Sequence, residues 1–274
     1  MFLVFLVISS CASYEPFYSD GVDGWQSENP PNSVNPDYSL FLIGDSRSAY
    51  TSPASLTMLE NQLSKAGENS AVIFLGDNVF PNGLPDSTDK SWDLAEKSLL
   101  AQLEILQNYE GQVIYIPGNH DWAHGRTEGL EYIKNQRKYI ENYLDQSKIF
   151  LPKKGTPGPT EVKLTDDIVV ILIDTYWWFH ENDKSYGGII DEGDFFVQIE
   201  DAVSRNRDKK IILAAYNPLY SVGNYGVILA QQTTSSLCWN LTGHSISHCQ
   251  AFCIQATESF WVERRTFRIR STNY

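Results

Sequence analysis

Three short polar sequences, each directly after an apolar run, carry the side chains that could do chemistry. Asp45 lies in IGDSR, Asp77 lies in LGDNVF, and Asn119 and His120 lie in PGNHDW. Carboxylate and amide oxygens with a nearby imidazole suit a pair of cations about 4 Å apart. Such a pair lowers the pKa of a bound water and balances the charge that builds up on a phosphate ester during hydrolysis. These residues therefore predict metal-assisted cleavage of a phosphate ester.

The pattern between residues 38 and 215 is that of a layered α/β sheet, because apolar runs of strand length alternate with segments of helical period. The expected strands cover residues 38–44, 71–76, 112–118 and 209–215, with a hairpin of 160–165 and 168–175. The expected helices cover residues 52–67, 91–108, 130–144 and 195–206. Ligand sites in open α/β sheets lie outside the carboxyl ends of the strands, so the three polar turns should converge.

The order GD, GDN and GNHD resembles the calcineurin-like metallophosphoesterase superfamily. With IDTYWW and NPLYSVG, the chain is most similar to the branch related to purple acid phosphatases, over roughly residues 38–226. The resemblance implies an α/β fold in which a layered β-sandwich of mixed sheets is flanked by helices, here with an incomplete C-terminal part. It also implies two divalent or trivalent metal ions, Fe, Mn or Zn, and a small phosphate ester as substrate.

The resemblance further implies a role for each residue of the three turns. Asp45 would bind the first metal, Asp77 would bridge both, and Asn119 would bind the second. His120 would steady the phosphate or protonate the leaving alkoxide, an effect worth roughly 10²–10⁴-fold. Phe80 stands where the purple enzymes have an iron-binding tyrosine, so no tyrosinate-iron chromophore is expected.

Later positions depart from the family pattern. Family members usually have histidine where this chain has Tyr216, histidine or tyrosine where it has Asn217, and often histidine where it has Tyr225. A closing Gly-His-x-His is replaced here by GHSISH. The chain therefore lacks about half of the usual protein donors. Three hypotheses remain: an active phosphoesterase with impaired metal binding, a non-catalytic descendant that binds a cation or phosphate weakly, and a lipid-tethered scaffold.

The two ends of the chain carry separate expectations. Residues 1–11 resemble a signal peptide that ends in a lipobox-like ISSC, which implies lipidation of Cys11 and an exported, membrane-anchored bacterial lipoprotein on the periplasmic or cell-surface side. The alternative is an apolar strand followed by a chance cysteine. Residues 12–36 are expected to form a polar tether before a partial phosphoesterase domain at 37–226. Residues 227–274 contain arginine but no lysine, which indicates either a frameshifted tail or a poorly patterned subdomain.

The net charge limits the class of partner, and the remaining histidines and tryptophans can be assigned to places in the expected fold. The net charge of −13 argues against a nucleic-acid partner, because backbone binding needs clustered lysine and arginine. We expect His124 and His180 to be surface or loop histidines. We expect Trp177 and Trp178 to pack in the core or at the mouth of the cleft.

Overall fold

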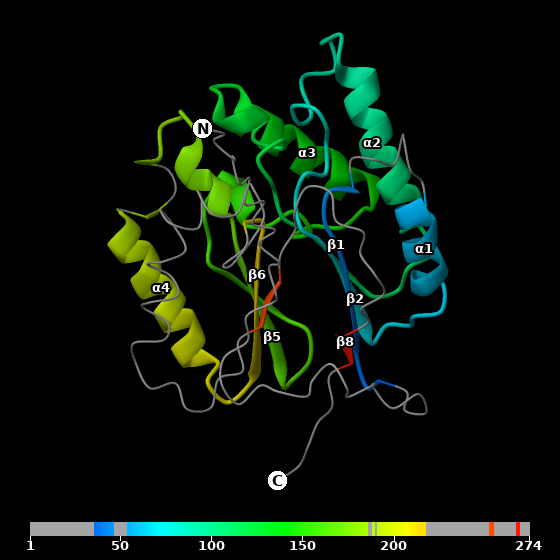
Figure 1. Cartoon of the computed structure of the whole chain (residues 1–274), viewed down its shortest axis with the longest axis vertical. Coiled ribbons are helices and arrows are strands. Elements are labelled where there is room, and N and C mark those ends of the chain that lie inside the picture. Colours follow the sequence, from blue (N-terminus) through cyan, green and yellow to red (C-terminus); the bar gives the residue numbers. More distant parts are fainter. Residues whose placement is uncertain are drawn as a thin grey trace, which may run out of the picture.

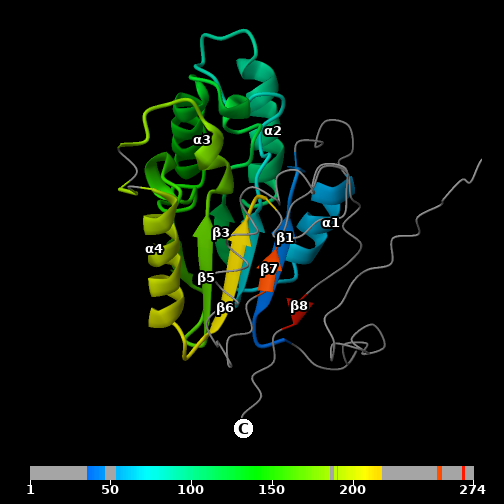
Figure 2. The same cartoon turned by 60° about the vertical axis from the view of Figure 1, so that its left-hand side comes forward.

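The computed structural model describes residues 36–46, 54–185, 188–189 and 191–217, and the backbone of two short strands at 252–254 and 267–268. This described part contains two four-stranded sheets, with strand orders β3-β2-β1-β8 and β4-β5-β6-β7. Figures 1 and 2 show both sheets between α4 on one side and α1 on the other. The arrangement is a sandwich of two sheets flanked by helices.

Three parallel strands and one antiparallel strand form the first sheet. They are β1 (Ser39–Ile43), β2 (Ser70–Phe74), β3 (Gln112–Tyr115) and β8 (Phe267–Arg268), of which β8 is antiparallel to β1. Ile43 lies opposite Phe74, and Phe74 lies opposite Tyr115. The carboxyl ends of the three parallel strands therefore meet at one edge of the sheet.

The second sheet is mixed. It contains β4 (Thr160–Lys163), β5 (Ile168–Ile173), β6 (Lys210–Ala215) and β7 (Phe252–Ile254). The antiparallel pair β4 and β5 is the predicted hairpin, whereas β5, β6 and β7 run parallel. Ile173 lies opposite Ala215, so the loops after β5 and β6 begin side by side.

The helices are α1 (Ala54–Leu63), α2 (Trp92–Glu104), α3 (Gly129–Tyr143) and α4 (Glu192–Arg205), with short 3₁₀ turns η2 (Ala123–Gly125), η3 (Lys153–Gly155) and η4 (Thr175–Phe179). Helix α1 buries Leu56, Leu59 and Leu63, the face that their spacing predicts. Helix α4 begins where the Asp191 carboxylate accepts the N–H of Asp194 at 2.9 Å. None of the described helices is long and apolar enough to cross a membrane.

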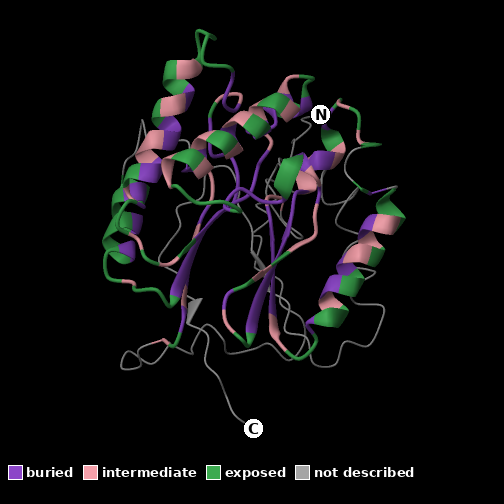
Figure 3. Ribbon diagram, turned by 180° about the vertical axis from the view of Figure 1, so that it is seen from behind, coloured by how far each residue is buried: buried purple, intermediate pink, exposed green. Residues whose placement is uncertain are grey.

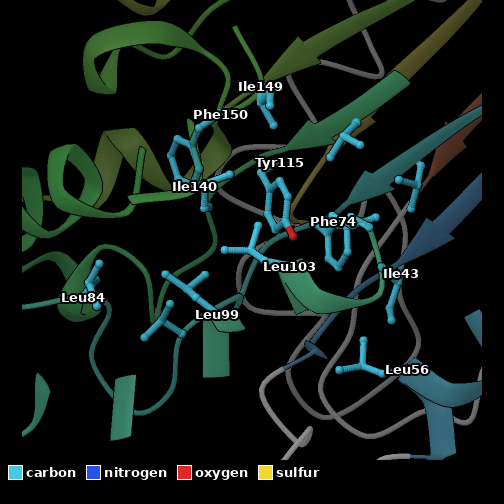
Figure 4. Close-up of a cluster of buried hydrophobic side chains, with 14 of the residues drawn as sticks. Ile43, Leu56, Phe74, Leu84, Leu99, Leu103, Tyr115, Ile140, Ile149 and Phe150 are labelled. Atoms are coloured by element: carbon cyan, nitrogen blue, oxygen red, sulfur yellow. The ribbon is translucent and has the colours of Figure 1, made fainter. Parts of the chain in front are cut away.

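The core consists of one layer between the sheets and one under the helices on each outer face. Along β2, Val72 and Phe74 pack with α1, α2 and α3, whereas Ala71 and Ile73 pack between the sheets. Figure 4 shows the layer under α1, α2 and α3, in which the Phe74 and Tyr115 rings stack with centroids 4.1 Å apart. The strands are accordingly buried along most of their length and the helices only on one face (Figure 3). A third layer packs α4 on β5 and β6.

The expected fold class is confirmed, as is each strand and helix expected between residues 38 and 215, with ends that differ by a few residues. The helix-start signal at Ser52 and Pro53 lies outside the described residues. So do Cys11, almost all of the 12–36 tether and residues 218–226. Of residues 227–274, which we expected to be aberrant, the structure describes only β7 and β8, and each pairs with one of the sheets.

Candidate functional site

The polar turns that follow β1, β2 and β3 lie at one edge of the first sheet, as expected from the parallel strands. The N–H of Asp45 donates to the carbonyl of Gly76 at 3.1 Å, which joins the first turn to the residue before Asp77. Asp45 and Asp77 have φ angles of 53° and 55°. Few residues other than glycine adopt this left-handed conformation, and aspartate tolerates it better than most. The chain therefore turns sharply where each of these strands ends.

Asp77 is the centre of the site. Its side chain is buried, and its Oδ1 accepts the backbone N–H of His120 at 3.0 Å. Its Oδ2 accepts the hydroxyl of Tyr216 at 2.9 Å. The turns after β2 and β3 in one sheet and the end of β6 in the other thus meet at a single carboxylate.

The side-chain amide of Asn119 contacts the same group. With its nitrogen turned inward, it donates to Asp77 Oδ1 and Oδ2 at 3.1 and 3.2 Å and to the Tyr216 hydroxyl, and its oxygen lies 3.2 Å from His124 Nδ1. With its oxygen turned inward, the amide accepts from Tyr216 but presents its nitrogen to His124. The first orientation gives the amide nitrogen acceptors on the Asp77 carboxylate and gives the amide oxygen a donor in His124 Nδ1.

Asp121 holds two of the turns together, a role that sequence reasoning missed. It is fully buried, and its carboxylate accepts the N–H groups of Gly118 at 2.7 Å, Asn78 at 3.1 Å and Val79 at 3.0 Å. Burial, and then the charge of Asp77, raise the pKa of Asp121, whereas these hydrogen bonds lower it. The motif GNHDW contained the residue, but its type alone does not separate a metal ligand from a structural acceptor.

His120 has a defined orientation. Its Nδ1 lies 2.7 Å from the carbonyl of Pro81, and because a carbonyl only accepts, Nδ1 carries the proton. Its Nε2 lies 4.0 Å from Asp77 Oδ2. The ring is 6% exposed and packs against Phe80 with centroids 4.7 Å apart. The structure thus places His120 beside Asp77, and its role towards phosphate stays a prediction.

His124 lies closer to the site than we expected. It is exposed and belongs to the short turn η2, in agreement with a loop histidine, but its ring lies 4.3 Å from that of His120 and its Nδ1 contacts Asn119. Burial, and then the charge of His120, lower the pKa of His124. The five-residue spacing from Asn119 gave no signal, because His124 reaches back through a left-handed backbone with φ 57°.

The end of β6 brings Tyr216 and Asn217 to the site from the second sheet. Asn217 Oδ1 accepts the hydroxyl of Thr175 at 2.7 Å, and the N–H of Asn217 donates to the same hydroxyl at 3.0 Å. These bonds fix the loop after β6 against the loop after β5. Asn217 therefore has a structural role here, and Tyr216 points at Asp77.

Beneath the site, a buried aspartate connects the GNHDW and IDTYWW loops. Asp174 Oδ2 accepts the indole N–H of Trp122 at 2.8 Å, and its Oδ1 accepts the N–H of Trp177 at 3.1 Å. Burial raises the pKa of Asp174 to about 7. Trp177 packs in the core, and Trp178 packs against it, as expected. His180 lies in a loop, one of the two places that we expected, but it is buried and its ring stacks on Trp122 with centroids 4.5 Å apart, so it is not at the surface.

The donors of the described residues do not fit a pair of cations. In this part of the chain, no three or more His, Cys, Asp and Glu side chains are grouped so that they could hold a metal ion. Asp45 and Asp77 supply carboxylates suited to one hard cation. The oxygen of Tyr216 lies within hydrogen-bond distance of both Asp77 and Asn119, the two residues that would share a second ion.

Comparisons with known proteins place the site in context. A family model described as calcineurin-like phosphoesterase matches residues 40–245, a span that includes the three turns and Tyr216. A comparison with curated proteins gives no match. Among solved structures, the chain is similar to the crystal structure of phosphopantetheinyl hydrolase (PptH) from Mycobacterium tuberculosis. The identity is 12% over 72% of this chain and 75% of that chain, with a TM-score of 0.36.

Proposed function

This chain belongs to the calcineurin-like phosphoesterase family, and we propose that within the family it hydrolyses phosphomonoesters of small molecules in a metal-dependent reaction. The observation that carries the proposal is the meeting of Asp77, Asn119 and His120 at one buried carboxylate. Asp77 follows β2, whereas Asn119 and His120 follow β3. A purely structural turn would not require an acid, an amide and an imidazole together.

The acidity of the site supports the requirement for a cation. Asp77 and Asp121 lie close enough for the charge of one to raise the pKa of the other, and Asp45 is joined to the same turn. A phosphate monoester carries negative charge and would be repelled by these carboxylates and by a chain with a net charge of −13. A divalent ion held by Asp45 and Asp77 would reverse this local charge and polarise a bound water.

His120 is the residue that we assign to proton transfer. Because its Nδ1 donates to the carbonyl of Pro81, Nε2 is the nitrogen on the side of Asp77. Protonated at Nε2, the ring can donate to a phosphate oxygen or to the departing alkoxide. A positioned acid of this kind contributes roughly 10²–10⁴-fold to the rate.

Hydrolysis of a chromogenic phosphomonoester, measured with and without added Mn²⁺ or Zn²⁺, tests the proposal. We expect the rate to depend on the metal, to disappear in Asp77→Ala, and to fall roughly 10²–10⁴-fold in His120→Gln. Asp167→Asn, which changes an exposed aspartate far along the chain, is the control and should keep the rate. A rate that is indifferent to metal, or that survives Asp77→Ala, contradicts the proposal.

A second candidate function has its own supporting observation. The contact of the Tyr216 hydroxyl with Asp77 and Asn119 favours a non-catalytic protein that binds a cation or phosphate weakly. Such a protein would be stabilised by Mn²⁺ or phosphate on heating but would release no product. Stabilisation together with a rate no higher than that of Asp77→Ala would select this function over hydrolysis.

Two finer assignments also belong to the proposal. Membership of the branch related to purple acid phosphatases, with Phe80 in place of the iron-binding tyrosine, predicts that the iron-loaded protein is colourless. Export with a lipid on Cys11 predicts that labelled palmitate enters the protein in bacteria and that Cys11→Ala abolishes the label. A visible charge-transfer band would count against the first assignment, and an unchanged label against the second.

A further inference from the structure

The hydroxyl of Tyr216 lies between the two side chains that could share a second cation. We propose that it excludes a cation from the space between Asp77 and Asn119, so that the site holds a single divalent ion. The inference rests on the proposed function, since it concerns the metal content of the same site. On this proposal, the Tyr216 hydroxyl competes with a second metal ion for Asp77 and Asn119.

The space between Asp77 and Asn119 is already occupied by the Tyr216 hydroxyl. Tyr216 Oη is 2.9 Å from Asp77 Oδ2 and is also in contact with the amide of Asn119. Oxygen ligands approach divalent cations at roughly 2.0–2.6 Å. An ion bound to both Asp77 and Asn119 would therefore occupy the place where the hydroxyl proton points. The cation and the hydroxyl proton of Tyr216, both positive, cannot occupy the same position beside Asp77.

The orientation of the Asn119 amide also disfavours a second cation. With its nitrogen inward, Asn119 donates to Asp77 and to the Tyr216 oxygen. Its oxygen, the only atom of the amide able to bind a metal, then faces His124. A second cation would have to displace the phenol and also turn the amide over. Each change breaks hydrogen bonds to the buried carboxylate.

The position of the phenol is built into the fold. A β-carbon added to Gly76 would lie 2.7 Å from Tyr216 Cδ2, and one added to Gly118 would lie 2.7 Å from Tyr216 Cε2. The ring thus rests on the two glycines that precede Asp77 and Asn119. The next residue is fixed by the pair of hydrogen bonds between Thr175 and Asn217. The ring cannot swing aside without disturbing these contacts.

Titration of the full-length chain with Mn²⁺, followed by calorimetry and by metal analysis after dialysis, tests the inference. We expect one ion in the natural chain, and about tenfold to a hundredfold tighter Mn²⁺ binding in Tyr216→Phe, because a hydrogen bond to a charged group no longer has to be broken. Tyr216→His, which supplies an imidazole, should bind two ions. Tyr139→Phe removes a hydroxyl bonded to Glu96 away from the site and should bind as the natural chain does.

Several results would overturn the inference. Two ions in the natural chain would do so, and so would equal or weaker binding in Tyr216→Phe. A tyrosinate absorption that appears with Mn²⁺ in the natural chain and is missing in Tyr216→Phe would show that Tyr216 is a ligand. Tyr216→Phe keeps the ring that packs on Gly76 and Gly118, so the test stands even if Tyr216→His folds poorly. Hydrolysis with two bound ions would reject this inference alone, whereas one bound ion without hydrolysis would reject only the proposed function.

Discussion

Replacement of Asp121 by asparagine removes one acceptor oxygen from the centre of the site while it keeps the shape of the side chain. The natural carboxylate accepts Gly118 N–H on one oxygen and Val79 N–H on the other, and Asn78 N–H lies between them. An asparagine can offer its oxygen to only one side. Its NH₂ group then faces the N–H of either Gly118 or Val79, two donors against each other.

The expected cost follows from counting these donors. One backbone N–H and the new NH₂ group are left without an acceptor in a position with no exposure to water. Each buried polar group without a partner costs about 1–3 kcal/mol, so Asp121→Asn should lower the free energy of unfolding by about 2–6 kcal/mol. For a domain of this size, that corresponds to a decrease in Tm of roughly 4–24 °C.

Urea unfolding followed by tryptophan fluorescence measures the change, with Asp167→Asn as the matched control because its side chain is exposed. The control should lie within about 0.5 kcal/mol of the natural chain. Asp121→Asn should also weaken Mn²⁺ binding, because it removes part of the hydrogen bonding that joins the turns carrying Asp77 and Asn119. Equal stability of the two variants would refute the assignment of Asp121 as the acceptor that joins the turns.

Two further substitutions test the close approach at the site and the buried histidine beneath it. Gly118→Ala would place a β-carbon 2.4 Å from Asp77 Oδ1 and should lower the free energy of unfolding, measured in urea, by about 1–3 kcal/mol. Gly67→Ala has open space around it and should leave the free energy of unfolding unchanged. Similar values for the two variants would contradict the steric argument. Burial, and then the charge of Lys184, lower the pKa of His180 to about 4. Between pH 6.5 and 4, His180 therefore binds a proton in the unfolded chain but not in the folded chain. The free energy of unfolding should therefore fall between pH 6.5 and 4, and His180→Phe should flatten this part of the curve; an unchanged slope would show that His180 titrates normally.

The fold could be predicted because short runs of apolar residues, spaced as in strands or helices, form most of its core. All five residues of β2, SAVIF, are buried, and alternate ones face the helices and the second sheet, so the run had to be an interior strand. The spacing of Leu56, Leu59 and Leu63 likewise left one helical face to bury. Exact ends were less predictable, because hydrogen bonding rather than residue type decides where a strand stops.

The convergence of the polar turns could also be predicted, since parallel neighbouring strands end at the same edge. The division of work among the turn residues could not. Asp77 and Asp121 have the same side chain and each follows the end of a strand, yet one receives Tyr216 from the other sheet and the other receives three backbone N–H groups. Apart from the bond to Gly118, that difference arises from tertiary contacts 40 and more residues apart along the chain. No local pattern records it.

The buried acid Asp77 is already stabilised by hydrogen bonds, and these bonds compete with any metal ion that would bind there. Asp77 receives the N–H of His120 and the hydroxyl of Tyr216, and the Asn119 amide adds a third donor. A cation that binds Asp77 must therefore compete with hydrogen bonds that already offset part of its charge. Removal of the hydroxyl alone shifts this competition towards the metal. In the proposed site, the identity of residue 216 would therefore set how many ions can bind, more than the three polar turns do.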